Sequence, residues 1–272
     1  MAKFKVSLVQ LCAQDDLSVN INMVERYIRE ASSQGAKLVC LPENTFFMQA
    51  PGKGQHPDST EAIDRCCALA VELKLWILIG SAHIGNDEKK SWNRSILVSD
   101  KGKIVAEYDK IHLFDVTLKN GEIYAESERI SGGAEAVLAN TPWGMMGMTV
   151  CYDLRFAGLY RTLAQAGATL IGIPAAFTYT TGIAHWHVLL RARAIETGCY
   201  IFAPAQCGIH PGNRRTYGHS LIVSPWGEII AEASEDKTEI ITAEIDTDKV
   251  SEARSMIPSL THDRKFTLKK FK

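Results

Sequence analysis

The sequence lacks an excess of charge of either sign. Its 30 lysines and arginines balance 31 aspartates and glutamates, which gives a formal net charge of −1. A chain without a basic field has no electrostatic means of holding nucleic acid or an anionic membrane surface, so we expect neither as a partner. The lysines of residues 265–272 are interpreted as a solvated end, with a small functional basic patch as the alternative.

Long hydrophobic runs are also missing. No apolar stretch reaches the roughly 20 residues needed to cross a bilayer. The apolar run at the amino terminus is too short for a signal peptide and leads directly into a strand-like alternation. We therefore expect a protein that stays in the cytoplasm.

Paired cysteine motifs are absent as well. The seven cysteines are an odd number without CxxC spacing, which favours neither a disulfide framework nor a zinc site. Adjacent Cys66 and Cys67 fall inside a helical pattern and are interpreted as packing residues. We expect a reducing compartment, no metal, no cofactor and no thiol redox role.

The sequence does contain a repeat of about 130 residues. "GAKLVCLPE" (35–43) is echoed by "GATLIGIPA" (167–175), and "SILVSDKGKIVAE" (95–107) by "SLIVSPWGEIIAE" (220–232). Helical patterns precede these strands: one is expected to begin at Asn20 and end at Gly35, and a second to begin around Asp58 and Glu61. Chance similarity between short hydrophobic strands is the alternative, but the common order of the echoes favours two similar halves.

Each half would form a sheet with helices on one face, and its other face needs cover too. We expect that cover to be the other half's sheet, which predicts an α/β fold: a four-layer αββα sandwich. The 46% hydrophobic content is enough for a large core. No Pro/Gly/Ser-rich linker separates the halves, so residues 1–272 are predicted to be a single domain.

Three polar residues follow strand-like segments. Glu43 occupies a position where the repeat has Ala175, so the fold itself does not require an acid there. Lys110 follows the hairpin strand and could equally be a solvated charge, and nearby His112 is interpreted as a structural side chain rather than a base. Cys151 is either a buried hydrophobe or a nucleophile on a strand-to-helix turn, where backbone N–H groups and the helix dipole would favour a thiolate.

An acid, an amine and a thiol at three strand ends form a usable catalytic set. A thiol that attacks a carbonyl needs a base for its proton, a donor for the developing oxyanion and an acid for the leaving group. Glutamate can serve as base and acid in turn, and lysine can stabilise the oxyanion.

The blocks "LPEN", "YDKIHLFD" and "CYDLRF", in this order, resemble the three catalytic blocks of the nitrilase superfamily of carbon–nitrogen hydrolases. The resemblance implies the αββα fold, with Glu43 as general base, Lys110 as stabiliser of the tetrahedral intermediate and Cys151 as nucleophile. It also implies that Glu126, which the sequence alone suggests is a surface charge, positions the lysine. The backbone N–H of Tyr152 would complete the oxyanion site.

The stretches "PAAFTYTTGIAHW", "LLRARAIET" and "RTYGHSLIVSPWG" look most like the deaminated glutathione amidase branch. This likeness implies hydrolysis of the tripeptide's amide to 2-oxoglutarate and cysteinylglycine. Alternatives are an omega-amidase acting on 2-oxoglutaramate, another small-amide hydrolase, or a binding or regulatory protein without turnover. His187 and Gly198 depart from the branch pattern, which has glutamate and a larger polar residue there.

Four residues are expected to bind a small-molecule amide substrate: Tyr152, Arg155, Phe177 and Thr178. Arg155 offers a bidentate fork for a carboxylate, although an internal salt bridge with Asp153 or another acid is an equal alternative. Residues 210–219 form either an entrance loop or an ordinary surface loop. The resemblance also implies a homodimer or larger homo-oligomer, with residues 156–167 in the contact or packed solely on their own sheet.

Overall fold

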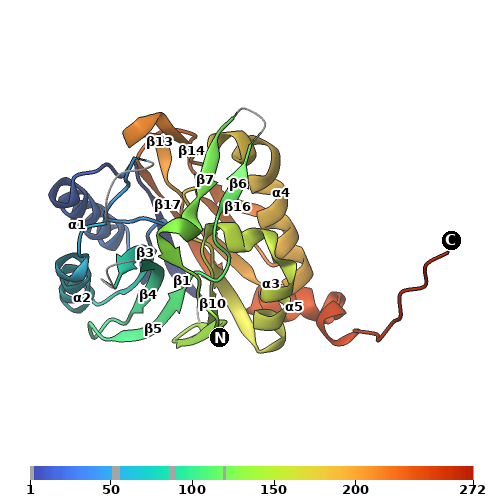
Figure 1. The fold of residues 1–272 in the computed structure, drawn as a ribbon. Helices are drawn as coiled ribbons and strands as arrows, with labels where there is room; N and C mark the ends of the chain where they lie inside the picture. Colours follow the sequence, from blue (N-terminus) through green and yellow to red (C-terminus); the bar gives the residue numbers. More distant parts are fainter. Residues whose placement is uncertain (1–2, 51–55, 86–89, 119–120, 272) are drawn as a thin grey trace.

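The computed structural model describes residues 3–50, 56–85, 90–118 and 121–271. Its strands form two large sheets that lie between helices on both sides (Figure 1). The first sheet has the strand order β17 (Glu239–Asp246), β1 (Lys3–Gln10), β2 (Leu38–Cys40), β3 (Trp76–Ile84), β4 (Ser91–Val98), β5 (Ile104–Asp109), with β8 (Ile130–Ser131) beside β4. The second has the order β16 (Ile229–Glu232), β15 (Leu221–Val223), β12 (Tyr200–Ala203), β11 (Ala168–Gly172), β10 (Gly144–Met148), β9 (Val137–Thr141).

Apart from β8, the strands of the two sheets correspond one to one, as the repeat predicts. In each, a parallel core of three strands continues into an antiparallel hairpin: β1–β2–β3 into β4–β5, and β10–β11–β12 into β15–β16. Each sheet also gains an antiparallel strand at its other edge, β17 or β9. The predicted αββα sandwich of two similar halves is confirmed.

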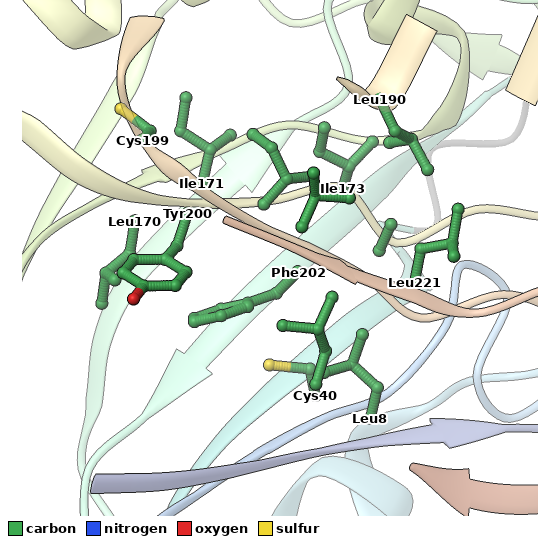
Figure 2. Packing of buried hydrophobic residues seen from close by; sticks show 14 of the residues in the cluster. Leu8, Cys40, Leu170, Ile171, Ile173, Leu190, Cys199, Tyr200, Phe202 and Leu221 are labelled. Atoms are coloured by element: carbon green, nitrogen blue, oxygen red, sulfur yellow. The ribbon is translucent and has the colours of Figure 1, made fainter. Parts of the chain in front are cut away.

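Alternating side chains hold the layers together. Leu8 and Cys40 of the first sheet pack in the same core as Phe202 of the second, between the sheets (Figure 2). The intervening residues Val9 and Val39 point the other way, into the core beneath the helices. Strands buried on both faces read as continuous apolar runs, which is why the sequence shows them so clearly.

Five α-helices and four short 3-10 helices complete the described chain. The helices are α1 (Leu17–Ser33), α2 (Thr60–Leu73), α3 (Ala157–Gln165), α4 (Tyr179–Thr197) and α5 (Asp248–Met256). The 3-10 helices are Glu126–Glu128, Cys151–Arg155, Pro211–Asn213 and Ser259–Thr261. Helices α1 and α2 cover the first sheet and α3 and α4 the second (Figure 1).

The first helix begins one turn earlier than predicted. Asp16, not Asn20, is the N-cap, and its carboxylate accepts a hydrogen bond from the Val19 N–H at 3.0 Å. Asn20 lies inside the helix, buried, and its amide donates to the carbonyls of Gln14 and Phe46. An asparagine in this position can cap a helix or tie down a loop, and here the buried carbonyls of the loop determine which it does.

Two small hairpins stand apart from the large sheets: β6 (Asp115–Thr117) with β7 (Ile123–Ala125), and β13 (Cys207–His210) with β14 (Arg214–Tyr217). The second comprises most of the segment 210–219, so that segment is a β-hairpin. Residues after Thr261 carry no helix or strand: Asp263 still forms an ion pair with Arg161 of α3, and Figure 1 shows the end of the chain running away from the body of the molecule. Within the described ranges, every helix is too short or too polar to cross a bilayer.

Candidate active site

Glu43 lies just beyond the end of β2 and is buried, with 3% of its surface exposed. Its Oε2 accepts a hydrogen bond from the Ala176 N–H, beyond the end of the equivalent strand β11, at 2.8 Å. The approach to Glu43 is tight: a Cβ on Gly80 of β3 would lie 2.1 Å from the Leu41 carbonyl oxygen. Glycine is thus required at position 80 by the backbone that leads into Glu43.

Lys110 follows β5 directly and is buried as deeply as Glu43. Its Nζ lies 2.9 Å from Oε1 of Glu43 and 2.8 Å from Oε2 of Glu126. Burial alone would lower the pKa of this amine, but the charges of Glu126 and Glu43 raise it well above its ordinary value. Lys110 is therefore an ammonium, and two carboxylates share it.

Glu126 opens the 3-10 helix that follows β7. Besides Lys110 it accepts a hydrogen bond from the Phe114 N–H at 2.7 Å. Its side chain is 16% exposed, so it is not the surface charge that the sequence alone suggests. The segment around it has no burial pattern that could have revealed this contact.

Asn93 of β4 is a member of the cluster that sequence reasoning missed. Its Nδ2 donates to Oε1 of Glu43 at 3.0 Å and to Oε1 of Glu126 at 3.1 Å. Its Oδ1 is buried and has no hydrogen-bond partner among the described residues. Asparagine is uncommon within strands, but the sequence alone does not distinguish a buried asparagine from a solvated one.

Two residues separate Cys151 from the end of β10, and Cys151 starts the 3-10 helix Cys151–Arg155. Its φ of 48° lies in the left-handed region, which is strained for a residue with a side chain. A hydrogen bond from its N–H to the Pro174 carbonyl, at 2.9 Å, holds the backbone there. The turn carries the thiol to within hydrogen-bonding reach of the Glu43 carboxylate.

Two effects that would favour a thiolate at Cys151, the nearby N–H groups and the helix dipole, are opposed here by burial and by charge. Burial and the neighbouring charge of Glu43 raise the pKa of Cys151 well above its ordinary value. Burial would also raise the pKa of Glu43, but the charge and hydrogen bond of Lys110 hold it below its ordinary range. The resting pair is therefore a neutral thiol beside a carboxylate, because burial and the charge of Glu43 both disfavour a thiolate.

Asp153 supports the turn from below. Fully buried, it accepts hydrogen bonds from the Val150 N–H at 2.8 Å and the Tyr108 hydroxyl at 2.7 Å, and its Oδ1 lies 2.7 Å from Nδ1 of His112. His112 also stacks on Phe156, which makes it a structural residue. The alternative salt bridge between Asp153 and Arg155 does not form, because other donors surround this carboxylate.

Arg155 instead lies against aromatic rings. Its guanidinium is 5.8 Å from the ring centre of Tyr152 and 5.3 Å from that of Phe177, and Nη1 lies 3.2 Å from Nδ1 of His185. Thr178 is buried at the N-cap of α4, where its hydroxyl is within 2.7 Å of the Thr181 hydroxyl. Arg155, Tyr152 and Phe177 thus form one group, while the Thr178 hydroxyl is already partnered.

Arg214, in β14, is a second arginine beside the cluster, and sequence reasoning did not single it out. Its Nη2 donates to the Ala176 carbonyl at 3.1 Å. The N–H of the same residue, Ala176, donates to Glu43, so Ala176 connects Arg214 to the cluster. The guanidinium lies over the ring of Tyr124, and its buried Nε has no partner among the described residues. The hairpin 210–219 therefore reaches the site. This favours the interpretation of the segment as an entrance loop over that of an ordinary surface loop.

Gly198 and His187, the two residues that depart from the branch pattern, have their described contacts outside the Cys151 cluster. Gly198 ends α4 with φ 59°, and a Cβ there would come within 2.8 Å of Arg254. His187, in α4, hydrogen-bonds Glu232 instead of any member of the cluster. Neither contact explains why the branch pattern has a different residue there.

Known proteins are similar to this chain in both sequence and fold. The family model described as carbon–nitrogen hydrolase matches residues 5–255. A Yersinia enterocolitica protein named deaminated glutathione amidase is 39% identical over 97% of this chain and 94% of its own. A Synechocystis protein of the same name is 37% identical over 96% and 98%. The crystal structure of the Caenorhabditis elegans NitFhit protein superposes with a TM-score of 0.89 at 34% identity, over 97% of this chain and 66% of that longer one.

Proposed function

The chain belongs to the carbon–nitrogen hydrolase family and is an amidase, and from this premise we propose that it cleaves deaminated glutathione through an acyl-thioester on Cys151. The observation that carries the proposal is the buried contact of a carboxylate with both an ammonium and a neutral thiol: Glu43 with Lys110 and Cys151. The products would be 2-oxoglutarate and cysteinylglycine.

In the first half-reaction Glu43 takes the thiol proton while Sγ of Cys151 bonds to the amide carbon. The carbonyl oxygen becomes an oxyanion beside Nζ of Lys110 and the Tyr152 N–H. The cluster's net charge does not change in this step, because the negative charge that leaves Glu43 reappears on the oxyanion. Collapse of the intermediate breaks the C–N bond, and the proton on Glu43 passes to the leaving amine.

Lys110 is poised for this shift of charge. In the resting site its hydrogen bonds go to Glu43 and Glu126. Protonation of Glu43 weakens the first of these, which frees a donor for the oxyanion, while Glu126 keeps the amine in position. In the second half-reaction water gives a proton to Glu43 and attacks the thioester, and Cys151 recovers that proton as the acid product leaves.

The charges around the site support an anionic substrate. Among the described residues neither Arg155 nor Arg214 forms an ion pair. Their guanidinium groups lie at opposite ends of a run of aromatic contacts from Tyr152 through Phe114 to Tyr124. Deaminated glutathione carries a carboxylate on each side of the scissile amide, and two separated arginines suit such a molecule.

The test compares two substrates. Wild type is expected to form 2-oxoglutarate from deaminated glutathione far faster than it releases ammonia from 2-oxoglutaramate. Cys151→Ala should abolish both reactions, whereas Cys67→Ala, which changes a half-buried cysteine of α2, should leave them unchanged. Turnover of 2-oxoglutaramate alone would overturn the substrate assignment, and turnover by Cys151→Ala would overturn the mechanism.

We also propose that the chain acts as one domain in the cytoplasm and as a homo-oligomer. On helix α4, Val188 is 67% exposed and Ile195 is 55% exposed, and their spacing of seven residues places both on one face of the helix. Burial of such a face against a second copy would stabilise a dimer. Sedimentation should therefore give a dimer or larger species that Val188→Asp weakens; a wild-type monomer at micromolar concentration would contradict this.

A further inference from the structure

Two histidines and a glutamate converge on the outer side of the second sheet. They come from three elements: His187 from α4, His219 from the segment before β15, and Glu232 from the end of β16. Oε1 of Glu232 lies 3.0 Å from Nε2 of His187 and 2.7 Å from Nδ1 of His219. All three atoms lie within 4.8 Å of one another.

This donor set suits a transition-metal ion. Two neutral imidazoles and one carboxylate are a common set of zinc ligands, with bonds of about 2.0–2.2 Å. A tetrahedral ion with such bonds holds its ligand atoms roughly 3.4 Å apart. The two separations from Oε1 of Glu232, 3.0 and 2.7 Å, are shorter than this, so both histidine nitrogens would have to move away from the carboxylate oxygen by roughly 0.4–0.7 Å to admit the ion.

The backbone holds the ligands in place from two sides. His219 has a φ of 51°, its N–H donates to the Ser234 carbonyl, and its own carbonyl accepts from Nε1 of the buried Trp186. Trp186 directly precedes His187, so one side chain ties the two ligand-bearing segments together. The His219 ring also packs against that of Tyr217, with centroids 4.5 Å apart.

The local charge also favours a cation. Glu232 accepts hydrogen bonds from both histidines through the same oxygen, Oε1. Among the described residues neither lysine nor arginine forms an ion pair with it. Both imidazoles hydrogen-bond the same oxygen of Glu232. A bound metal ion would replace these two hydrogen bonds with three bonds from the metal, one to each side chain.

We propose that His187, His219 and Glu232 form a binding site for a divalent transition-metal ion of the zinc type, with a fourth position open to water. The alternative is a hydrogen-bonded clamp that joins α4 to the sheet and binds no metal. The site shares no residue with the Cys151 cluster, so the proposal does not depend on the amidase assignment.

Calorimetric titration of the chelator-treated full chain with ZnCl₂ tests the proposal. Wild type should bind one equivalent, and His219→Ala and Glu232→Gln should each weaken that binding at least tenfold. Glu232→Gln nearly preserves shape and can still accept a hydrogen bond, so it separates loss of a ligand from loss of fold. His262→Ala, which removes an exposed histidine near the C-terminal end, is the matched control and should bind as wild type does.

Circular dichroism spectra that match wild type would show that the variants fold. Should His219→Ala unfold, His187→Ala serves in its place, because α4 keeps its buried Trp186. Absence of zinc binding in wild type, or equal binding in wild type and Glu232→Gln, would overturn the proposal. In either case the turnover experiment with Cys151→Ala remains a separate test.

Discussion

Asn93 offers the sharpest test of how the cluster sets the protonation state of Glu43. Its Nδ2 donates one hydrogen bond to each of Glu43 and Glu126, at 3.0 and 3.1 Å. A hydrogen bond to the ionised form of a carboxyl lowers its pKa. Asn93→Ala removes that support, so the pKa of Glu43 should rise. Asn93→Asp should raise it further, because a third carboxylate would lie close to two others.

The size of the effect follows from the bond that is lost. A hydrogen bond to a charged group contributes about 1.5–3 kcal/mol, which corresponds to a factor of about 10–100 in the ionisation equilibrium. The general base must be ionised, so activity is present above the pKa of Glu43 and is lost as pH falls through it. On the acidic side of the profile, kcat/KM of Asn93→Ala should therefore fall about 10- to 100-fold relative to wild type, and recover as pH rises.

The assay is the pH dependence of kcat/KM for wild type, Asn93→Ala and Asn93→Asp, with Asn22→Ala on the exposed face of α1 as control. The acidic limb should move toward higher pH in the order wild type, alanine, aspartate, while the control follows wild type. A merely structural role for Asn93 would lower activity equally at every pH. Profiles that differ in height but not in position would refute the reasoning.

Three further changes probe the same site. Lys110→Met leaves Glu43 and Glu126 buried without their cation. The free energy of unfolding, measured in urea, should therefore fall by about 3–5 kcal/mol, and kcat by at least about 100-fold. A variant as stable as wild type would contradict the shared ion pair. Arg214→Gln should raise KM for deaminated glutathione about 10- to 100-fold with a smaller change in kcat, since it removes one charged donor, and an unchanged KM would exclude a binding role. Gly80→Ala places a methyl group against the backbone that leads into Glu43, so both melting temperature and kcat should drop, and wild-type values would show that this backbone can yield.

The fold could be predicted from local patterns. Strands buried on both faces appear as uninterrupted apolar runs, and the repeat of those runs gives two equivalent sheets. Positions at strand ends also follow from the sequence, and this is why Glu43, Lys110 and Cys151 could be singled out before any contact was known. The helix start at Asp16 was missed because aspartate and asparagine both favour caps, and burial at Asn20 decides between them.

The rest of the site depends on contacts between residues far apart in the sequence. Asn93, Glu126 and Arg214 look like ordinary polar residues of a strand, a turn and a hairpin, and become site residues because the fold brings each beside a buried charge. The protonation states of Cys151 and Glu43 likewise follow from burial and from the position of Lys110. The sequence by itself determined the layers, the repeat and the reactive groups; the tertiary structure alone decided which charges meet away from water, because electrostatic interactions depend on distance and solvent exposure, which the order of residues does not encode.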